Sequence, residues 1–462
     1  MYKRALFVIA LLAACGDDDP ARHLDGGVTI DSATPMIDAP WEPVMLTITV
    51  NGTPQPNIVV HFQNADSSLV ATEMTNSTGT ASHVMAPGGY VTAIDPYVAP
   101  NTYSRLYTFA GVKPGDHLQL SHKTNAANIN MTITLPVQAD PAITRYVVRS
   151  SCTTTASIFA SSGSGFQPTG SVEFKANCAS ADILAASFNS ANDVVGYFIV
   201  PDQAITANGT LNYASKSYTP PTSRTYTFNN TTALTTLETT EFVFTAKGPV
   251  YVAPTQNGNT ATLTLPAFNG ATGLTHASGY SLATGALHDF FDWGPLATTP
   301  FTADIGARKL VDVTDPVFDN ATNTLSWTEG AGVAPDADYI DIDVQRTVAS
   351  NSNFNIDWQM IAPHTGASAK FPTLPAGTRD YTPDADDTVN PVYLVLIKAP
   401  PVGYDGIRAN GLAFETIVDT GVYNDLASAT PGSLALVTWQ EPLALHRPTS
   451  ERPNVLRHRS RR

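Results

Sequence analysis

The chain of 462 residues has little charge and no long apolar run beyond its first residues. Charged residues make up 14% of the sequence, well below the usual quarter, although the apolar share of 43% is normal for a globular protein. After residue 14, no stretch has the roughly 20 apolar residues that a transmembrane helix requires. The net charge of −15 argues against nucleic acid or an acidic membrane surface as a partner of the protein's body.

Short catalytic motifs are also missing. The sequence contains no Gly-x-Ser-x-Gly, no His-Glu-x-x-His and no glycine-rich phosphate loop. Its ten histidines are scattered. A catalytic site assembled from His, Asp and Ser residues that are distant in the sequence remains an alternative, because such a site requires a spatial arrangement rather than neighbouring positions. We therefore predict that the protein is not an enzyme, with an envelope hydrolase as the alternative.

Of only three cysteines, Cys15 ends a short apolar run. Lys3 and Arg4 precede the apolar residues Ala5–Ala14, which is the arrangement of a secretory signal peptide. The sequence Leu12-Ala-Ala-Cys15 resembles the lipobox of bacterial lipoproteins. This resemblance implies cleavage after the signal peptide of residues 1–14 and lipidation of Cys15, which would then anchor the chain in a membrane. The alternative is an ordinary secretory signal with a chance cysteine.

Residues 15–43 are rich in Asp, Pro, Ala and Gly and have few large apolar side chains. Such a segment cannot bury enough surface to offset the entropy lost on ordering, so we expect an extended, acidic, lipidated tether. Its composition is similar to that of myxobacterial lipoproteins. Gly16 stands where some lipoproteins carry an inner-membrane aspartate, which favours the outer membrane without specifying its periplasmic or surface-facing side.

Apolar and polar residues alternate through the body, for example at residues 46–50, 129–135, 261–265 and 340–344. This period of two predicts strands with one buried face. Frequent Asn-Gly, Pro-Gly and Gly-Gly pairs predict turns. Only one short helix is expected, near Ile183. The pattern predicts an all-β fold of serial antiparallel β-sandwich (Ig-like) domains.

We predict four β-units in the body. Residues 44–137 contain a Gly-x-Pro turn and the sequence Thr-Asn-Ser-Thr-Gly79, and they resemble a bacterial Ig-like or carboxypeptidase regulatory-like domain, which implies no catalytic residues. Residues 138–247 are expected to form a second β-domain and residues 248–312 a small β-unit.

Residues 313–445 resemble a fibronectin type III-like domain, because Trp327 lies on an early predicted strand where that family places a core tryptophan. Trp358 and the apolar residues 392–397 would continue this sandwich. Residues 446–462 contain six arginines and are predicted to be a basic disordered tail. An electrostatic contact of this tail with phosphate-bearing lipid or with the tether is the alternative.

The remaining cysteines, Cys152 and Cys178, are predicted to form a disulfide, since an isolated pair in an oxidising compartment usually does so. The alternative is two buried thiols. No CxxC motif indicates a redox or zinc role.

Two weak candidates for ligand binding remain. Asp384, Asp386 and Asp387 could supply oxygen ligands to calcium, but the EF-hand pattern is absent and a solvated loop is favoured, as it is for the acidic strand at residues 338–343. Phe291 and Trp293 could stack on a sugar, although filling of a core is favoured. No cofactor is predicted, and calcium is the only alternative.

Together these features predict a lipid-anchored protein of the bacterial outer membrane that lacks catalysis. Its β-sandwich domains would bind an envelope or extracellular protein or glycan, or act as a spacer. The alternatives are an envelope hydrolase with a non-local site and a calcium-stabilised adhesin. Apart from the membrane reached through the anchor, the sequence does not identify the partner.

Overall fold

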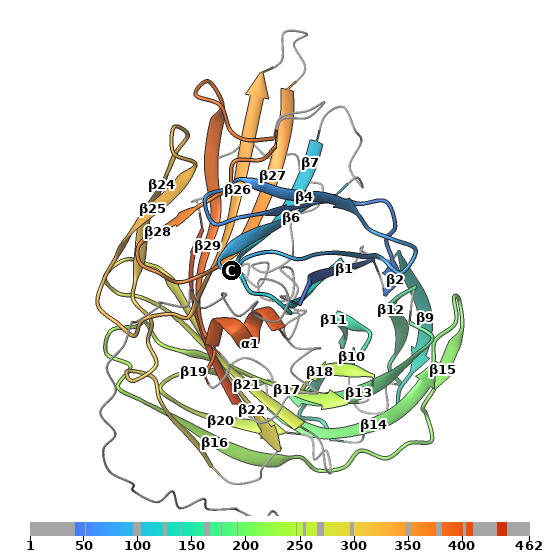
Figure 1. Cartoon of the computed structure of the whole chain (residues 1–462). Coiled ribbons are helices and arrows are strands. Elements are labelled where there is room, and N and C mark those ends of the chain that lie inside the picture. Colours follow the sequence, from blue (N-terminus) through green and yellow to red (C-terminus); the bar gives the residue numbers. More distant parts are fainter. Residues whose placement is uncertain are drawn as a thin grey trace, which may run out of the picture. The chain divides into compact units, whose positions relative to one another are not determined.

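The computed structural model shows an all-β body, as predicted (Figure 1). Within the described residues, the single helix is α1 (Gly403–Ala409). The structure describes residues 42–440 except 51, 96–102, 123–126, 139, 161–166, 177, 192, 246, 253–255, 266–271, 296–299, 348–352, 376–380, 401–402 and 410–431. The described residues belong to one compact unit that begins at Trp41. No helical segment in these ranges has the length and apolar character of a membrane span.

The largest sheet has 13 strands. Its strand order is β18 (Gly248–Tyr251), β17 (Glu238–Thr245), β21 (Thr272–Tyr280), β22 (Leu287–Pro295), β30 (Gly432–Gln440), β29 (Thr388–Lys398), β26 (Ala337–Thr347), β27 (Asn353–Pro363), β7 (Tyr103–Val112), β6 (Gly89–Asp95), β3 (Val59–Gln63) and β4 (Leu69–Met74), with β19 (Gln256–Asn257) on β17.

The other described strands form five smaller sheets. They are β2 (Thr53–Pro54), β1 (Val44–Val50) and β5 (Thr80–His83) with β8 (His117–His122) on β1; β11 (Thr153–Ala160), β10 (Ile143–Ser150), β13 (Ser180–Asn189) and β14 (Val194–Ala204); β12 (Thr169–Lys175), β9 (Asn128–Thr134) and β15 (Thr210–Asn212); β20 (Thr260–Leu265), β16 (Thr222–Asn229) and β23 (Phe301–Asp304); and β24 (Val313–Asp319), β25 (Thr324–Glu329) and β28 (Ser368–Lys370).

The central strands of the large sheet are buried on both faces. Ile340 of β26 and Trp358 of β27 lie in a first hydrophobic core, which the sheets of β16 and β25 also line. Tyr339 and Ile361, from the same two strands, lie in a second core against β1 and β8. Because both faces are covered, the residues 392–397 of β29 form a continuous apolar run rather than an alternating one.

The helix predicted near Ile183 is wrong, because Ile183 lies in β13. Ile183 and Ala185 enter a third core, between the sheets of β10 and β9, whereas Leu184 and Phe188 enter the first core. A strand that is buried on both faces reads as an unbroken apolar segment. Such a segment cannot be told from a buried helix by periodicity.

Strand pairing joins residues on either side of the predicted domain boundaries. β9 of segment 44–137 pairs with β12, β16 pairs with β20, and β22 pairs with β30. Four described pairs are parallel rather than antiparallel: β1 with β8, β9 with β15, β16 with β23, and β7 with β27. The predicted segments therefore share sheets.

Candidate functional site

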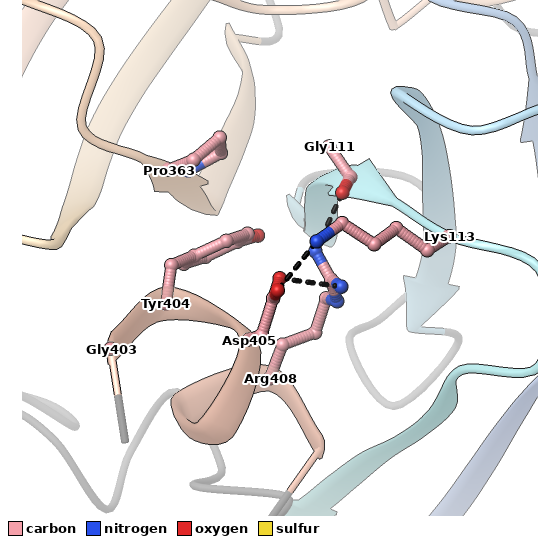
Figure 2. A pocket seen from close by; sticks show the side chains of 7 residues that line it. All are labelled: Gly111, Lys113, Pro363, Gly403, Tyr404, Asp405 and Arg408. Carbon is pink, nitrogen blue, oxygen red and sulfur yellow. Dashed lines mark hydrogen bonds and ion pairs between the residues drawn. The ribbon is translucent and has the colours of Figure 1, made fainter. Parts of the chain in front are cut away.

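A cavity of about 300 Å³ lies beside α1, at the ends of β7 and β27, which are two inner strands of the large sheet (Figure 2). The parallel pairing of β7 with β27 brings Gly111 beside Pro363. Gly111 has φ 62°, and a Cβ there would approach the Pro363 ring to 3.0 Å. A side chain at this position would therefore be strained and would fill part of the cavity. The lining residues are Gly111, Lys113, Pro363, Gly403, Tyr404, Asp405 and Arg408.

Arg408 holds α1 to the end of β7. Its side chain is buried, and Nη1 donates a hydrogen bond of 2.6 Å to the carbonyl oxygen of Gly111. Its Nε lies 2.7 Å from a carboxylate oxygen of Asp116, and its Nη2 donates to Asp405 at 3.0 Å. The guanidinium thus meets two carboxylates and one carbonyl, which compensates its loss of water.

The other polar groups of the cavity are also paired. Lys113 Nζ lies 2.5 Å from a carboxylate oxygen of Asp405, and this hydrogen bond is the main reason why the pKa of Asp405 is lowered. The Tyr404 hydroxyl donates to the carbonyl oxygen of Ala110, and burial raises its pKa. Two cations therefore face two anions, and the cavity adds the Tyr404 ring and Pro363 as apolar walls.

A buried histidine–carboxylate cluster begins directly after the cavity residue Pro363. His364 Nδ1 lies 2.8 Å from Asp338 Oδ1, and His364 Nε2 lies 3.6 Å from Glu329. Trp327 Nε1 donates to Glu329 at 2.7 Å. Asp338 is 0% exposed, and its Oδ2 has no hydrogen-bond partner among the described residues.

The two groups of this cluster have shifted pKa values. Burial raises the pKa of Asp338 to about 6, against the hydrogen bond from His364, which lowers it. Burial disfavours charge on His364, but the hydrogen bond to Asp338 and the nearby negative charges outweigh burial and raise its pKa. The favoured interpretation of residues 338–343 as a solvated acidic strand is wrong for Asp338.

Two further histidine–carboxylate pairs with largely buried side chains lie within the sheets, apart from the exposed pair His83–Glu73. His288 Nε2 is 2.8 Å from Asp312, and burial is the main cause that lowers the pKa of His288. His276 Nε2 is 2.8 Å from Asp289. Neither histidine is among the residues that line the cavity.

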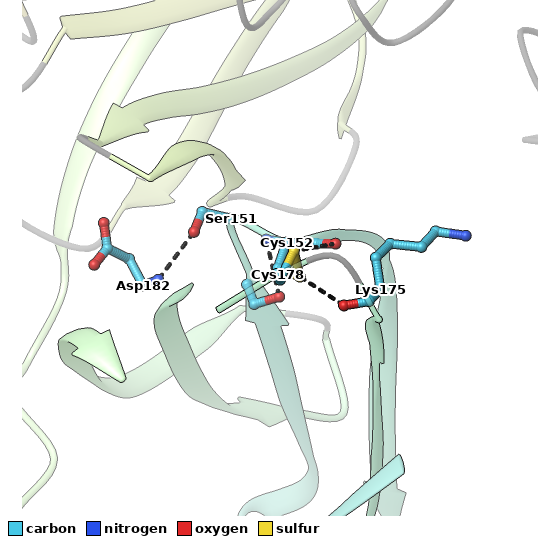
Figure 3. The surroundings of a disulfide bond; sticks show 6 residues. Ser151, Cys152, Lys175, Cys178 and Asp182 are labelled. Atoms are coloured by element: carbon cyan, nitrogen blue, oxygen red, sulfur yellow. Dashed lines mark hydrogen bonds between the residues drawn. A yellow bond between two sulfur atoms is a disulfide. The ribbon is translucent and has the colours of Figure 1, made fainter. Parts of the chain in front are cut away.

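The predicted disulfide between Cys152 and Cys178 is confirmed (Figure 3). It joins the turn after β10 to the turn between β12 and β13, and its Cα atoms are 6.2 Å apart. Next to it, Ser151 Oγ accepts a hydrogen bond of 2.9 Å from the backbone N–H of Asp182. The bridge and this bond hold the end of β10 in place. Cys15, residues 15–41 and the tail at 446–462 lie outside the described residues.

The calcium candidates do not form an oxygen cage. Arg346 Nη2 lies 2.6 Å from Asp387 and 3.3 Å from Asp384, so a guanidinium already occupies these carboxylates. Asp386 is exposed in the same loop. Across the described residues, no group of three or more His, Cys, Asp or Glu side chains is arranged to hold a metal ion.

The aromatic candidates lie on β22. Phe291 is 5% exposed and stacks on His276 with ring centroids 4.5 Å apart, so it fills the second core. Trp293 is partly buried and packs against the same core.

Sequence reasoning missed the cavity and the His364 cluster. Arg408 and Asp116 are separated by 292 residues. No spacing signal connects such distant positions. The one local signal was the short segment Gly403–Ala409, which has an acidic first turn and a basic last turn.

No known family model matches this chain, and no curated protein matches it. Among solved structures, a match is described as the Bacillus anthracis TIE protein, with 10% identity and a TM-score of 0.15 over 57% of this chain and 50% of that chain. This chain thus spans half the length of that protein. A structural similarity with so low a TM-score supports no conclusion about fold or function.

Proposed function

We propose that this protein is a lipid-anchored component of the bacterial outer membrane, whose all-β body binds an envelope or extracellular protein or glycan, or acts as a spacer, without catalysis. The lipobox-like sequence ending at Cys15 and the acidic tether after it support the anchor. The extensive sheets and the disulfide give the body the rigidity that a binding or spacer module needs.

The pairing of charges in the cavity carries the non-catalytic part of this proposal. A hydrolytic site needs a nucleophile and a base directed at a space that a substrate can enter. The residues that line the cavity instead neutralise one another, Lys113 with Asp405 and Arg408 with Asp116. The His364–Asp338 pair is held inside the protein, since the side chain of His364 is 9% exposed and that of Asp338 is 1% exposed.

The anchor can be tested by substitution of its cysteine. Wild type is expected in the detergent phase after Triton X-114 partition, with an acylated N-terminal peptide in mass spectrometry. Cys15→Ser is expected to lose both properties, while the Cys178→Ser variant keeps them. A Cys15→Ser protein that still partitions into detergent with the wild-type N-terminus would refute the anchor.

Protease shaving of intact cells separates the two faces of the membrane. Release of peptides from residues 44–445 would place the body outside the cell, and the partner search would begin with matrix and neighbouring cells. An intact protein in the outer-membrane fraction would direct the search to periplasmic partners and peptidoglycan, and would exclude the adhesin alternative.

A further inference from the structure

The ring of His364 differs from the other paired histidines, because both of its nitrogens face a carboxylate. Nδ1 lies 2.8 Å from an oxygen of Asp338, and Nε2 lies 3.6 Å from an oxygen of Glu329. Within the described residues, the other histidine–carboxylate ion pairs use one ring nitrogen each, as in His83, His276 and His288.

This arrangement around His364 requires the protonated ring. A neutral imidazole has one N–H and one lone pair, so it can donate to only one of two carboxylates, whereas the imidazolium can donate to both. After loss of one proton, the remaining N–H would stay on Nδ1, where the contact with Asp338 is shorter. The lone pair of Nε2 would then face the carboxylate of Glu329, and an attraction would become a repulsion.

The two carboxylates belong to different sheets. Asp338 lies on β26 of the large sheet, and Glu329 is the last residue of β25, in the smaller sheet of β24, β25 and β28. His364 comes directly after β27 and begins the segment that leads to β28. The ring therefore lies where the chain passes from the large sheet to the smaller one, and its positive charge joins the two.

Glu329 is the partner that can leave the ring. Its side chain is 20% exposed, against 1% for Asp338, so water can solvate its carboxylate. Glu329 also accepts a hydrogen bond of 2.7 Å from the indole Nε1 of Trp327, which lies in the first core. A displacement of Glu329 therefore changes the surroundings of Trp327.

The remaining charges near the ring favour its protonated form. Burial lowers the pKa of His364, but the hydrogen bond to Asp338 and the charges of Asp338, Glu329 and Asp336 raise it more. The carbonyl oxygen of Asp336 accepts a hydrogen bond of 3.1 Å from the backbone N–H of His364. Lys398 Nζ lies 2.6 Å from the Asp336 carboxylate. Neither contact involves the imidazole proton, so both persist when this proton leaves.

We propose that His364 is a proton-controlled link between the two sheets, in which the charged ring holds the end of β25 against β26 and β27, and loss of the proton releases Glu329. Burial raises the pKa of Asp338 to about 6, so Asp338 is neutral in more acidic solution, but the charged ring still faces Glu329 there. The link therefore opens on the alkaline side, as the pH rises through the raised pKa of His364. This inference does not rest on the proposed lipid anchor.

The first test is a titration of individual histidines in the full chain, in a non-ionic detergent. Deuterium exchange at the C2 position of each imidazole, followed by mass spectrometry of peptides, gives the pH at which that ring loses its proton. We expect a midpoint for His364 above the ordinary 6.5, and a midpoint lower by roughly half a pH unit in Glu329→Gln. The control Glu238→Gln removes one exposed carboxylate on β17 and should leave this midpoint unchanged. A midpoint at or below 6.5, or one that Glu329→Gln does not lower, would overturn the proposal.

Tryptophan fluorescence tests whether proton loss releases Glu329. The spectrum of wild type minus that of Trp327→Phe gives the signal of Trp327, which should change with the same midpoint as the His364 titration. The same difference measured in a His364→Gln background should not change, because glutamine does not ionise. His117→Gln, at an exposed histidine, is the matched control and should behave like wild type. A Trp327 signal that stays constant through the His364 midpoint would overturn the proposal.

If His364→Gln does not fold, His364→Lys provides the same test. Lysine keeps its positive charge and its donors well above neutral pH, so it can continue to bind Glu329 after the wild-type histidine has lost its proton. The Trp327 signal should therefore keep its low-pH form through the wild-type midpoint. A transition of His364→Lys at the wild-type midpoint would show that another group controls Trp327, and would overturn the proposal.

Discussion

Arg408 and Arg149 occupy comparable positions, since each is a buried or partly buried arginine at a junction between elements, but their surroundings differ. Arg408 meets Asp116, Asp405 and a carbonyl oxygen, so every charge around it is matched by other parts of the protein. Arg149 meets an aromatic ring and one carbonyl oxygen. A cation that is paired with carboxylates has its loss of water compensated, whereas a cation that meets only a ring and a carbonyl oxygen is compensated less.

The largest expected effect is the loss of the matched arginine. Arg408→Met leaves Asp116 without its cation, and removing one partner of a buried pair typically costs about 3–5 kcal/mol. Urea unfolding followed by circular dichroism measures this change in the free energy of unfolding. Arg149→Met is the comparison variant and should change it little. Similar losses in both variants would remove the distinction between the two arginines.

Removal of the disulfide should affect the region around Arg149 and β10 and leave the region around Arg408 and α1 unchanged. The chain-entropy treatment assigns about 3.5 kcal/mol to a loop that spans 26 residues. The double variant Cys152→Ser/Cys178→Ser should lose roughly that much stability, with the loss centred on the end of β10. The hydrogen bond between Arg408 and Gly111 should be unaffected, as amide hydrogen exchange around α1 would show. Unchanged stability would contradict this prediction.

Asp338 provides a buried charge that can change with pH. Burial raises the pKa of Asp338 in the folded state to about 6, above the ordinary 3.8 of an aspartate, so the folded state holds a proton that the unfolded state has released between these pH values. The free energy of unfolding should therefore fall as pH rises through this window. The raised pKa of His364 extends the fall above pH 6.5.

Asp338→Asn tests this pH dependence. The stability of the variant relative to wild type should rise by on the order of 2 kcal/mol between pH 4 and pH 7, because the asparagine cannot ionise. The exposed Asp384→Asn is the matched control and should follow wild type. Parallel pH profiles of Asp338→Asn and wild type would contradict the shift.

The smallest effect is expected at the rim of the cavity. Lys113 and Asp405 are 53% and 60% exposed, and an ion pair with this exposure contributes about 0–1 kcal/mol. Lys113→Met should therefore destabilise the protein far less than Arg408→Met. A loss above about 2 kcal/mol, measured by urea unfolding, would mean that water screens the rim less than its exposure implies.

Local features of this fold could be predicted from the sequence, whereas long-range ones could not. The alternation of Leu46 and Ile48 with threonines specified β1, and Trp327 and Trp358 lie on strands in the first core as expected. The disulfide followed from cysteine count and compartment. Alternation of apolar and polar residues identifies a strand but not the strand with which it pairs. The pairing of β7 with β27 could therefore not be predicted from the sequence.

The candidate site was harder to predict for a related reason. Arg408 and Asp338 depend on partners from other elements, and Arg149 of β10 meets the ring and the carbonyl oxygen of Tyr251 of β18. A sequence shows which residues carry charge, but not which charges remain unmatched after folding. The strand at residues 338–343 could not be assigned correctly, because burial of its second face depends on strands that lie far away in the chain.

The parallel pairing of β7 with β27 also determines when the protein can finish folding. Thr108 of β7 and Trp358 of β27, which are joined by a hydrogen bond, lie 250 residues apart. During synthesis, the β6–β7 ribbon must wait with one open edge until β27 emerges. A chain interrupted before residue 353 would keep that edge exposed and would be prone to aggregate. The β6–β7 ribbon therefore needs protection from aggregation while about half of the chain is still being made, since 250 residues separate Thr108 from Trp358.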